Sequence, residues 1–220
     1  MRSAAAPAAS AGATHATGAQ PPLSFADAAN LLLVGTTAAE LLHVSRAQPG
    51  ETALLHGAAG AVGNSVLQHV RHLGVRVVGT ASKANFAFVR QFGGTPVEYG
   101  TGLLERIRAA APEGISAALD TVGSDEATAV SLALVPDRRR VITIAAAPRA
   151  KDDRYFFVGA SNPQKRTVPC PRSLSHPRAC RQGVLTVPIA QTFKFEDAPA
   201  AFAMLTGQHR PGKIALINEN

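Results

Sequence analysis

One glycine- and alanine-rich segment has the residue types and the spacing that bind phosphate groups. It reads Gly57-Ala58-Ala59-Gly60-Ala61-Val62-Gly63, follows an apolar run that ends at His56, and precedes a helical pattern. This is the G-x-G-x-x-G plan with Ala58 in the first glycine position. Gly60 would let the backbone approach a pyrophosphate held by amide N–H groups at a helix N-terminus, and Gly63 would let the helix pack closely on the strand. A plain turn is the alternative, but the strand–turn–helix context favours dinucleotide binding.

The end of the next expected strand bears on which nicotinamide dinucleotide is bound. NAD-binding loops place an acid about 20 residues beyond the first glycine, where it holds the ribose 2′-hydroxyl. Between Glu51 and Glu98 this sequence has no acid, and the strand ends instead on Ser82 and Lys83. A hydroxyl and an ammonium favour the 2′-phosphate that a carboxylate would repel. The sequence therefore predicts NADPH, although Ser82 as a helix cap and Lys83 as a solvated side chain explain the same residues.

Strand-like and helical patterns alternate along the chain around this loop. A helical pattern comes first, with Ser24 as its N-cap and Gly35 expected to divide it into two helices. Short apolar strands alternating with helices predict a single α/β domain, a doubly wound parallel sheet of the Rossmann type. The expected strands are 52–56, 75–79, 96–99, 115–120, 140–145, 186–193 and 213–217, and the expected helices are 63–73, 83–92, 103–110, 126–134 and 197–206.

The charge of the chain is concentrated in one stretch. Of the net +7, residues 138–181 hold 11 Lys and Arg against two acids, so the rest of the chain is slightly acidic. Nucleic-acid binding needs a basic face with aromatic or groove-reading elements, which this stretch lacks, so we do not expect it. No apolar run approaches the roughly 20 residues of a membrane span, so we expect no membrane partner. We expect residues 1–22 to be a low-complexity, disordered tail ahead of a domain over residues 23–220.

Cysteine and histidine usage predicts no metal site. Cys170 and Cys180 have no cluster of His or Cys around them, so they complete neither a four-ligand zinc site nor a disulfide framework. We therefore expect a reducing, cytoplasmic location. The histidines His43, His56, His69 and His72 lack ligand spacing and are expected to be satisfied or on the surface, and Asp120 is expected to be structural, for example as a helix cap.

Several strings in chain order resemble the medium-chain dehydrogenase/reductase superfamily. They resemble its cofactor domain, and within it the zinc-free quinone oxidoreductase (zeta-crystallin-like) branch. The strings are Gly35-Thr36-Thr37-Ala38, Gln48-Pro49-Gly50-Glu51, the glycine-rich segment at 57–63, Leu119-Asp120-Thr121-Val122-Gly123, Tyr155-Phe156-Phe157-Val158 and Gly212-Lys213-Ile214.

The resemblance implies a set of cofactor contacts. Thr37 would lie near the nicotinamide, and Ala59, Gly60, Ala61, Val62 and Gly63 would form the pyrophosphate turn. Ser82, Lys83 and Tyr99 would surround the 2′-phosphate, while Phe156, Phe157 and Val158 would bring backbone to the carboxamide or, alternatively, pack in the core. No catalytic residue is identified. The resemblance also implies a small carbonyl or quinone substrate, and a homodimer through a sheet edge is one assembly that family members form.

Two segments depart from the family pattern. Members carry a GroES-like substrate domain of more than a hundred residues before the cofactor domain, and only residues 1–20 stand in its place, so half of the wall of the substrate cleft is missing and a truncated gene product is one hypothesis. Residues 163–183 replace an expected helix with a Pro-, Arg- and Cys-rich run in which helical structure would cost about 3 kcal/mol per interior proline. Translation in a shifted reading frame is one hypothesis for this run, and a basic insertion that binds a partner is the other.

Three functions remain open at this point. The first is an NADPH-dependent oxidoreductase of the quinone/enone reductase type, which would transfer hydride from NADPH to a conjugated carbonyl. The second is a catalytically silent module or fragment that binds NADPH without turnover. The third is nucleic-acid binding through the basic stretch.

Overall fold

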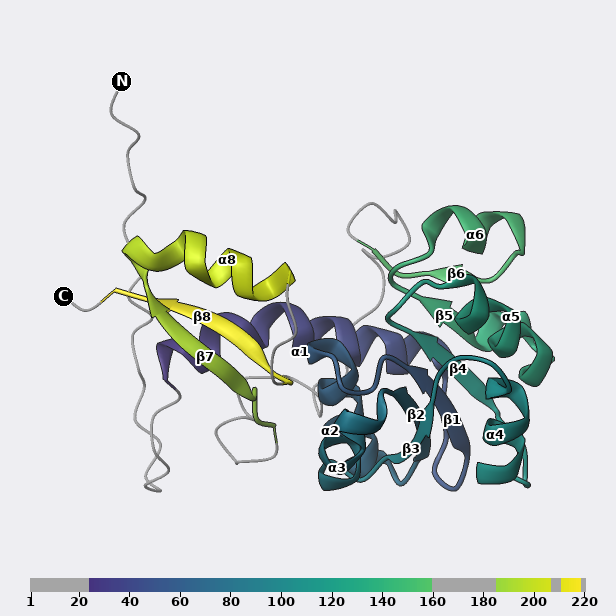
Figure 1. Cartoon of the computed structure of the whole chain (residues 1–220). Helices are drawn as coiled ribbons and strands as arrows, with labels where there is room; N and C mark the ends of the chain where they lie inside the picture. Colours follow the sequence, from purple (N-terminus) through teal and green to yellow (C-terminus); the bar gives the residue numbers. More distant parts are fainter. Residues whose placement is uncertain (1–23, 160–184, 207–210, 219–220) are drawn as a thin grey trace.

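A computed structural model describes residues 24–159, 185–206 and 211–218 (Figure 1). The predicted tail over residues 1–22, the atypical segment over residues 163–183 and both cysteines lie outside the described residues. The domain boundaries and the two hypotheses for residues 163–183 therefore stay predictions.

A six-stranded parallel sheet forms the centre of the fold. Its strands are β1 (Thr52–His56), β2 (Arg76–Ala81), β3 (Thr95–Glu98), β4 (Ala117–Asp120), β5 (Val141–Thr143) and β6 (Phe156–Phe157). They lie in the order β3-β2-β1-β4-β5-β6, and every pair is parallel. The chain thus winds outward from β1 in one direction and then from β4 in the other, which confirms the predicted doubly wound Rossmann sheet.

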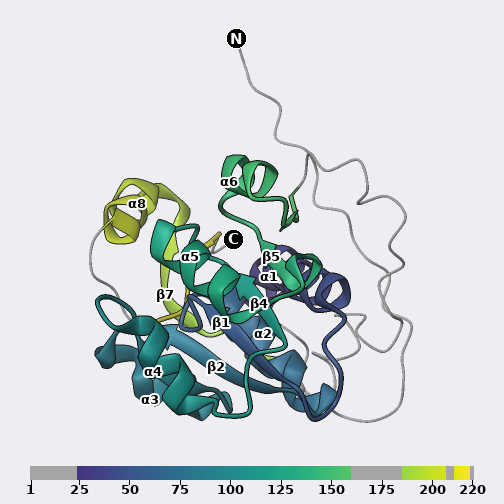
Figure 2. The ribbon, with the colours of Figure 1, turned by 90° about the vertical axis from the view of Figure 1, so that its right-hand side faces the viewer.

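Helices cover both faces of this sheet. The helices are α1 (Phe25–Ser45), α2 (Ala61–Leu73), α3 (Phe86–Gln91), α4 (Leu103–Ala110), α5 (Asp125–Leu134) and α6 (Ala147–Asp152), with 3-10 turns at Lys83–Asn85 and Arg138–Arg140. One face packs against α1, α2 and α3 in a core that includes Leu41, Leu55 and Val66, all fully buried. The other face packs against α4, α5 and α6 around Leu54 and Ile107 (Figure 2). Strands β1, β4 and β5 are buried at every residue, which explains why they read as largely apolar runs.

Helix α1 is one continuous helix, so the prediction that Gly35 divides it was wrong. Its N-cap is Ser24, as predicted, because the Ser24 hydroxyl accepts from the N–H of Asp27 at 3.1 Å. One glycine costs a helix interior only about 1 kcal/mol, which packing of the same helix on the sheet outweighs. By length and composition, Ala26–Ser45 is also apolar enough to cross a membrane, with a mean hydropathy of 1.2. A core helix passes the same test, and α1 packs on the sheet through buried side chains such as Leu41.

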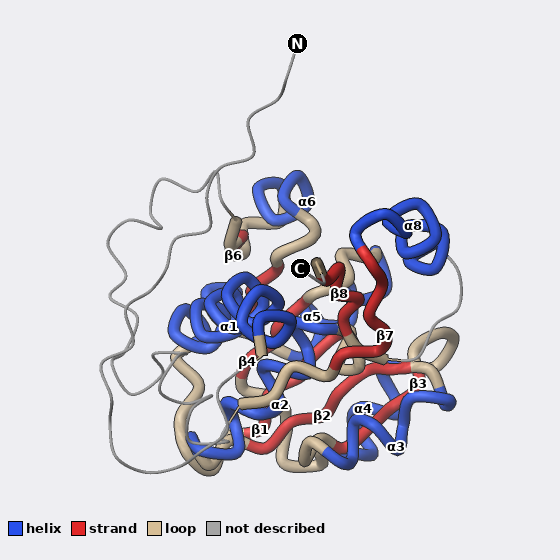
Figure 3. Tube along the Cα trace, turned by 90° about the vertical axis from the view of Figure 1, so that its left-hand side faces the viewer, coloured by secondary structure: helices blue, strands red, loops and turns tan. Residues whose placement is uncertain are grey.

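The C-terminal elements form a second, smaller layer beside α1. Strand β7 (Ile189–Lys194), a 3-10 turn (Phe195–Asp197), helix α8 (Ala198–Thr206) and strand β8 (Lys213–Ile217) make a two-stranded parallel sheet with its own helix. Figure 1 shows this unit next to the N-terminal half of α1, away from the six-stranded sheet, and Figure 3 views the unit from its own side, with α8 above β7. The strands were predicted in sequence, but their pairing in a separate sheet was not.

Candidate functional site

The largest opening beside the glycine-rich turn lies at the point where the strand order reverses. It is a cavity of about 520 Å³ at the carboxyl ends of β1, β2 and β4. Open α/β sheets bind ligands at this switch point, because the connections leave it in opposite directions. Four of the predicted site residues line it: Ala59, Gly60, Ser82 and Tyr99. The lining residues that the sequence did not single out for the site are His56, Gly57, Thr80, Ala81, Asn85, Val122, Ser124, Glu126 and Ala127.

The glycine-rich turn is shaped by close contacts that larger residues would not permit. Gly57 has φ +78°, and a Cβ there would lie 2.5 Å from Thr121 Oγ1. A Cβ on Gly63 would lie 2.2 Å from the carbonyl oxygen of Gly57, so the first turn of α2 packs directly on the loop. Ala58 is fully buried, and a Cβ on Gly79 would lie 2.5 Å from its methyl group. The predicted steric role of Gly63 is therefore confirmed, with the loop rather than the strand as its neighbour.

Helix α2 begins without a side chain to cap it. Its N-cap is Gly60, which makes no side-chain hydrogen bond, and the first turn contains no acid. The amide N–H groups at the start of a helix have no intrahelical acceptor, and together with the helix dipole they attract an anion. This helix of 13 residues begins at the cavity wall, where its N-cap Gly60 is exposed. The predicted pyrophosphate residues Ala61, Val62 and Gly63 form this first turn.

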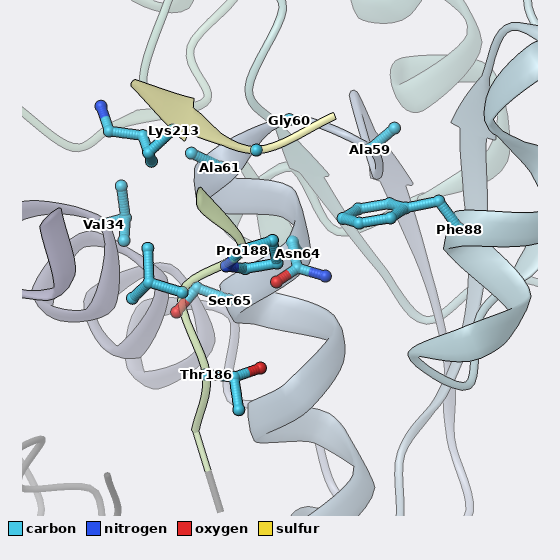
Figure 4. A pocket seen from close by; sticks show the side chains of 12 residues that line it. Val34, Ala59, Gly60, Ala61, Asn64, Ser65, Phe88, Thr186, Pro188 and Lys213 are labelled. Atoms are coloured by element: carbon cyan, nitrogen blue, oxygen red, sulfur yellow. The ribbon is translucent and has the colours of Figure 1, made fainter. Parts of the chain in front are cut away.

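The opposite side of the same turn meets the entry to β7. Figure 4 shows Thr186, Pro188 and Lys213 gathered beside Gly60 and Asn64 around a space of only about 10 Å³, roughly one water molecule. The Gln68 side chain of α2 exchanges two hydrogen bonds with the Thr186 backbone, donating to its carbonyl at 2.9 Å and accepting from its N–H at 2.7 Å. The smaller sheet is thus fastened to the helix that carries the turn.

A buried histidine joins β1 to the neighbouring elements just before the turn. His56 Nε2 lies 3.1 Å from Ser131 Oγ of α5, and Nδ1 lies 3.4 Å from Thr80 Oγ1. The Thr80 hydroxyl also accepts from the N–H of Gly57 at 3.1 Å. Burial lowers the pKa of His56 to about 4, although the nearby Asp120 carboxylate acts in the opposite direction. The imidazole is therefore neutral at neutral pH, and the expectation of a satisfied histidine is confirmed.

Asp120 holds the turn that follows β4. It is 2% exposed, and its carboxylate accepts from the N–H groups of Val122 and Gly123 at 2.9 and 3.0 Å and from the Thr143 hydroxyl at 2.8 Å. The structural role was predicted, but the helix cap was not assigned correctly. The N-cap of α5 is Ser124, whose side chain accepts from the N–H of Ala127. Asp120 therefore shapes the wall of the cavity that Val122 and Ser124 form.

The predicted 2′-phosphate residues lie at the rim of the cavity beside an acid from another strand. Ser82 and Tyr99 line the cavity, and Tyr99 is 56% exposed. The Lys83 ammonium lies outside the lining and pairs with the Glu98 carboxylate at 3.2 Å. Glu98 reaches this place because β2 and β3 pair with Ala81 opposite Glu98. Glu98, which lies far from Lys83 in the sequence, thus places an acid beside the end of β2 through the pairing of the strands.

The remaining predicted site residues lie apart from this cavity. Thr37 is partly buried in α1, where its hydroxyl donates to the Leu33 carbonyl. Phe156 lines a different pocket with His43 and Arg139, and Phe157 and Val158 pack in the core. Their predicted contacts with a nicotinamide stay predictions.

The described residues do not supply a metal site. No group of three or more His, Cys, Asp or Glu side chains in the described ranges could hold an ion.

Comparison with known proteins identifies relatives of the whole chain. A family model described as zinc-binding dehydrogenase matches residues 93–216, more than half of the chain. The medium chain reductase pydE of an Acremonium species is 27% identical over 92% of this chain and 61% of its own length. Mouse prostaglandin reductase 1 is 33% identical over 60% of this chain and 37% of its own length. The chain thus spans about three fifths of the length of the first of these relatives.

Solved structures show the same architecture. A mycobacterial protein, Rv1454c, complexed with NADPH superposes with a TM-score of 0.72 and 25% identity over 90% of this chain and 68% of that one. The enoyl reductase CurK superposes with a TM-score of 0.71 and 26% identity over 91% of this chain and 65% of that one. Together with the family match, these likenesses cover both the six-stranded sheet and the C-terminal elements.

Proposed function

The chain belongs to the zinc-binding dehydrogenase family of the medium-chain dehydrogenase/reductase superfamily, and from that premise we propose that it binds NADPH and serves as an oxidoreductase of the quinone/enone reductase type. The observation that carries the proposal is the cavity of about 520 Å³ at the switch point, which ends on the uncapped N-terminus of α2. A dinucleotide, with a pyrophosphate dianion at its centre and a flat base at each end, suits such a cavity, because one wall offers amide N–H groups and the rest is largely apolar.

The turn at the start of α2 is the proposed pyrophosphate site. Its glycines remove the Cβ atoms that would fill the cradle, since one on Gly60 would already lie 3.2 Å from the Gly57 carbonyl oxygen. The proposed donors are the N–H groups of Ala59, Ala61, Val62 and Gly63, while the Gly60 N–H donates to the Gly57 carbonyl oxygen at 3.0 Å and closes the turn. No side chain of this turn carries charge, so its anion affinity comes from the backbone and the helix dipole.

The rim formed by β2 and β3 is the proposed site of the adenosine ribose and its 2′-phosphate. Ser82 and Tyr99 offer hydroxyl groups there, and Lys83 offers the only positive charge among the predicted contacts. A freely rotating ammonium binds phosphate as a point charge. The carboxylate of Glu98 opposes this preference. The affinity for NADPH therefore depends on whether the Lys83 ammonium pairs with Glu98 or with the 2′-phosphate.

The reduced nicotinamide, when bound, supplies the hydride for the reaction. This chain's described residues bind and orient, and none is positioned as an acid for a substrate. The ionisable side chains in the cavity are His56, Tyr99 and Glu126, and His56 and Glu126 are already engaged in hydrogen bonds within the protein. The described residues do not offer zinc a donor set, so no step is assigned to zinc despite the family's name. We propose a small conjugated carbonyl or quinone as substrate, in line with the reductases to which the chain is similar.

A second candidate is a module that binds NADPH without turnover. The observation that favours it is that two of the three ionisable side chains lining the cavity, His56 and Glu126, are engaged in hydrogen bonds within the protein, which leaves Tyr99 at the exposed rim. We propose that residues 23–220 form the nucleotide-binding domain, working in the cytoplasm as a monomer or a homodimer.

Titration followed by an activity assay separates the two candidates. Purified protein is titrated with NADPH and with NADH while nicotinamide fluorescence is recorded, and NADPH oxidation is then measured with quinones and enones. Binding with turnover supports the oxidoreductase, and binding without turnover supports the silent module. If neither nucleotide binds while the protein remains folded by circular dichroism, both candidates are wrong.

A further inference from the structure

Glu98 places a carboxylate beside Lys83, at the end of β2, where NAD-binding domains carry an acid. This acid comes from β3, whereas an acid of β2 itself is the usual pattern. Its carboxylate lies 3.2 Å from the ammonium of Lys83 at the end of β2. The Glu98 side chain is 39% exposed and that of Lys83 is 77% exposed, so the pair faces solvent at the cavity rim. The lysine expected to bind a 2′-phosphate therefore already has an anionic partner.

The backbone that carries Glu98 is held firmly from two sides. Arg106 of α4 donates to the carbonyl oxygen of Glu98 through Nε at 3.0 Å and Nη2 at 2.8 Å, and to that of Gly100 at 2.9 Å. From α5, the Glu126 carboxylate accepts from the N–H of Gly100 at 2.9 Å. Tyr99 lies between these anchored residues and lines the cavity. These attachments hold the backbone of Glu98 in place, so its side chain extends from a fixed point beside the rim.

Lys83 has more freedom than its partner. Lys83 is the first residue of the 3-10 turn Lys83–Asn85, and its ammonium is largely exposed at the end of a flexible four-carbon side chain. An ion pair in such a setting contributes little, because solvent screens it and two side chains lose freedom. The ammonium can therefore exchange one anion for another at low cost, while the Glu98 carboxylate extends from an anchored backbone.

We propose that Glu98 is a specificity-determining residue that limits the preference for NADPH over NADH. The inference rests on the proposed dinucleotide site. A 2′-phosphate must take Lys83 from Glu98 and remain beside the carboxylate that has lost its counter-ion. NADH has no 2′-phosphate, so it meets neither cost. The chain therefore binds NADPH less selectively than Lys83 alone would dictate.

The test removes the charge of Glu98 and keeps its shape. Glu98→Gln is titrated with NADPH and NADH beside the wild type, with nicotinamide fluorescence as the readout. We expect the dissociation constant for NADPH to fall about fivefold and that for NADH to change by less than about twofold. Glu105→Gln is the matched control, because Glu105 is an exposed acid of α4 that does not line the cavity.

A second variant separates an effect through Lys83 from a general change of charge. In a Lys83→Met background, Glu98→Gln should improve NADPH binding by no more than about twofold, because no ammonium is left to release and only the solvent-screened repulsion between the Glu98 carboxylate and the 2′-phosphate is relieved. An equal improvement with and without Lys83, or an equal improvement in Glu105→Gln, would overturn the proposal. So would an unchanged ratio of the two dissociation constants in Glu98→Gln, while the proposed function would stand. If the wild type binds neither nucleotide, the proposed function itself fails.

Discussion

Acidification should weaken the fold through one buried residue, His56. In the folded protein burial lowers the pKa of this imidazole from 6.5 to about 4. The unfolded chain takes up the proton near pH 6.5, while the folded chain resists it until about pH 4. Stability is therefore constant above about pH 6.5 and falls as the pH drops through this window. At 1.36 kcal/mol for each unit of pKa difference, the loss approaches about 3 kcal/mol at the acid end.

Three carboxylates have lowered pKa values and contribute to stability changes only below most of this window. Glu51, Glu113 and Asp137 have lowered pKa values, with hydrogen bonds as the main cause. They stabilise the fold when ionised, and that stabilisation is lost only as the pH falls below their ordinary values of 4.5 and 3.8. Between about pH 6.5 and 4.5 the slope therefore reports the histidine, with an expected loss of about 2 to 3 kcal/mol.

Urea denaturation at half-unit steps from pH 7.5 to 4.5 measures this loss. His56→Gln keeps a hydrogen-bonding group near Ser131 but cannot titrate, so its stability should be nearly flat over the window. His43→Gln, a change at an exposed histidine, should retain the slope of the wild type. Parallel curves for the wild type and His56→Gln between pH 6.5 and 4.5 would refute the reasoning, because the proton uptake would then belong to another group.

Three further substitutions test other parts of the structure. Lys83→Glu should raise the dissociation constant for NADPH by about tenfold relative to that for NADH, measured by fluorescence titration; an equal loss for both would remove Lys83 from the 2′-phosphate site. Gly63→Val places a Cβ that would lie 2.2 Å from the Gly57 carbonyl oxygen, so it should destabilise the fold by about 1 to 3 kcal/mol in urea and abolish nucleotide binding. Wild-type stability in that variant would contradict the packing. Arg140→Ala breaks a half-buried ion pair with Glu51 that also satisfies the Ser45 carbonyl, and should cost about 1 to 3 kcal/mol in urea without changing NADPH binding. If the free energy of NADPH binding by Arg140→Ala changed as much as its free energy of unfolding, the prediction that this ion pair does not influence the cavity would be wrong.

Much of the fold was predictable because local signals agree with the tertiary structure. Helix Leu103–Ala110 and strand Lys213–Ile217 have the predicted bounds, and Ser24 caps α1 as expected. In each case the decisive features, an apolar period or a capping side chain, lie within a few residues of one another. The short elements α6 and β6 were not predicted, since six and two residues carry too little pattern to distinguish them from loop.

The features that were missed depend on contacts between distant residues. Gly35 does not break α1, because the packing of the whole helix outweighs one weak residue. The pairing of β7 with β8 in a separate sheet has no signature in either strand. Glu98 meets Lys83 only through the register of β2 and β3, and His56 becomes part of the site wall through Thr80 and Ser131. The turn that we propose binds phosphate has a local pattern, whereas the walls around it depend on contacts between distant residues.

A charge placed at the start of α2 tests the central claim most directly. Gly60 has φ −71° and ψ 168°, a conformation that suits Asp and Asn as N-caps, so Gly60→Asp and Gly60→Asn should both fold with wild-type helix content. The two side chains have the same size and differ in charge. We predict that the dissociation constant for NADPH, measured by nicotinamide fluorescence, is about tenfold higher for the Asp variant than for the Asn variant, because only the former repels a pyrophosphate. Equal affinities in two folded variants would contradict a dinucleotide site at this helix.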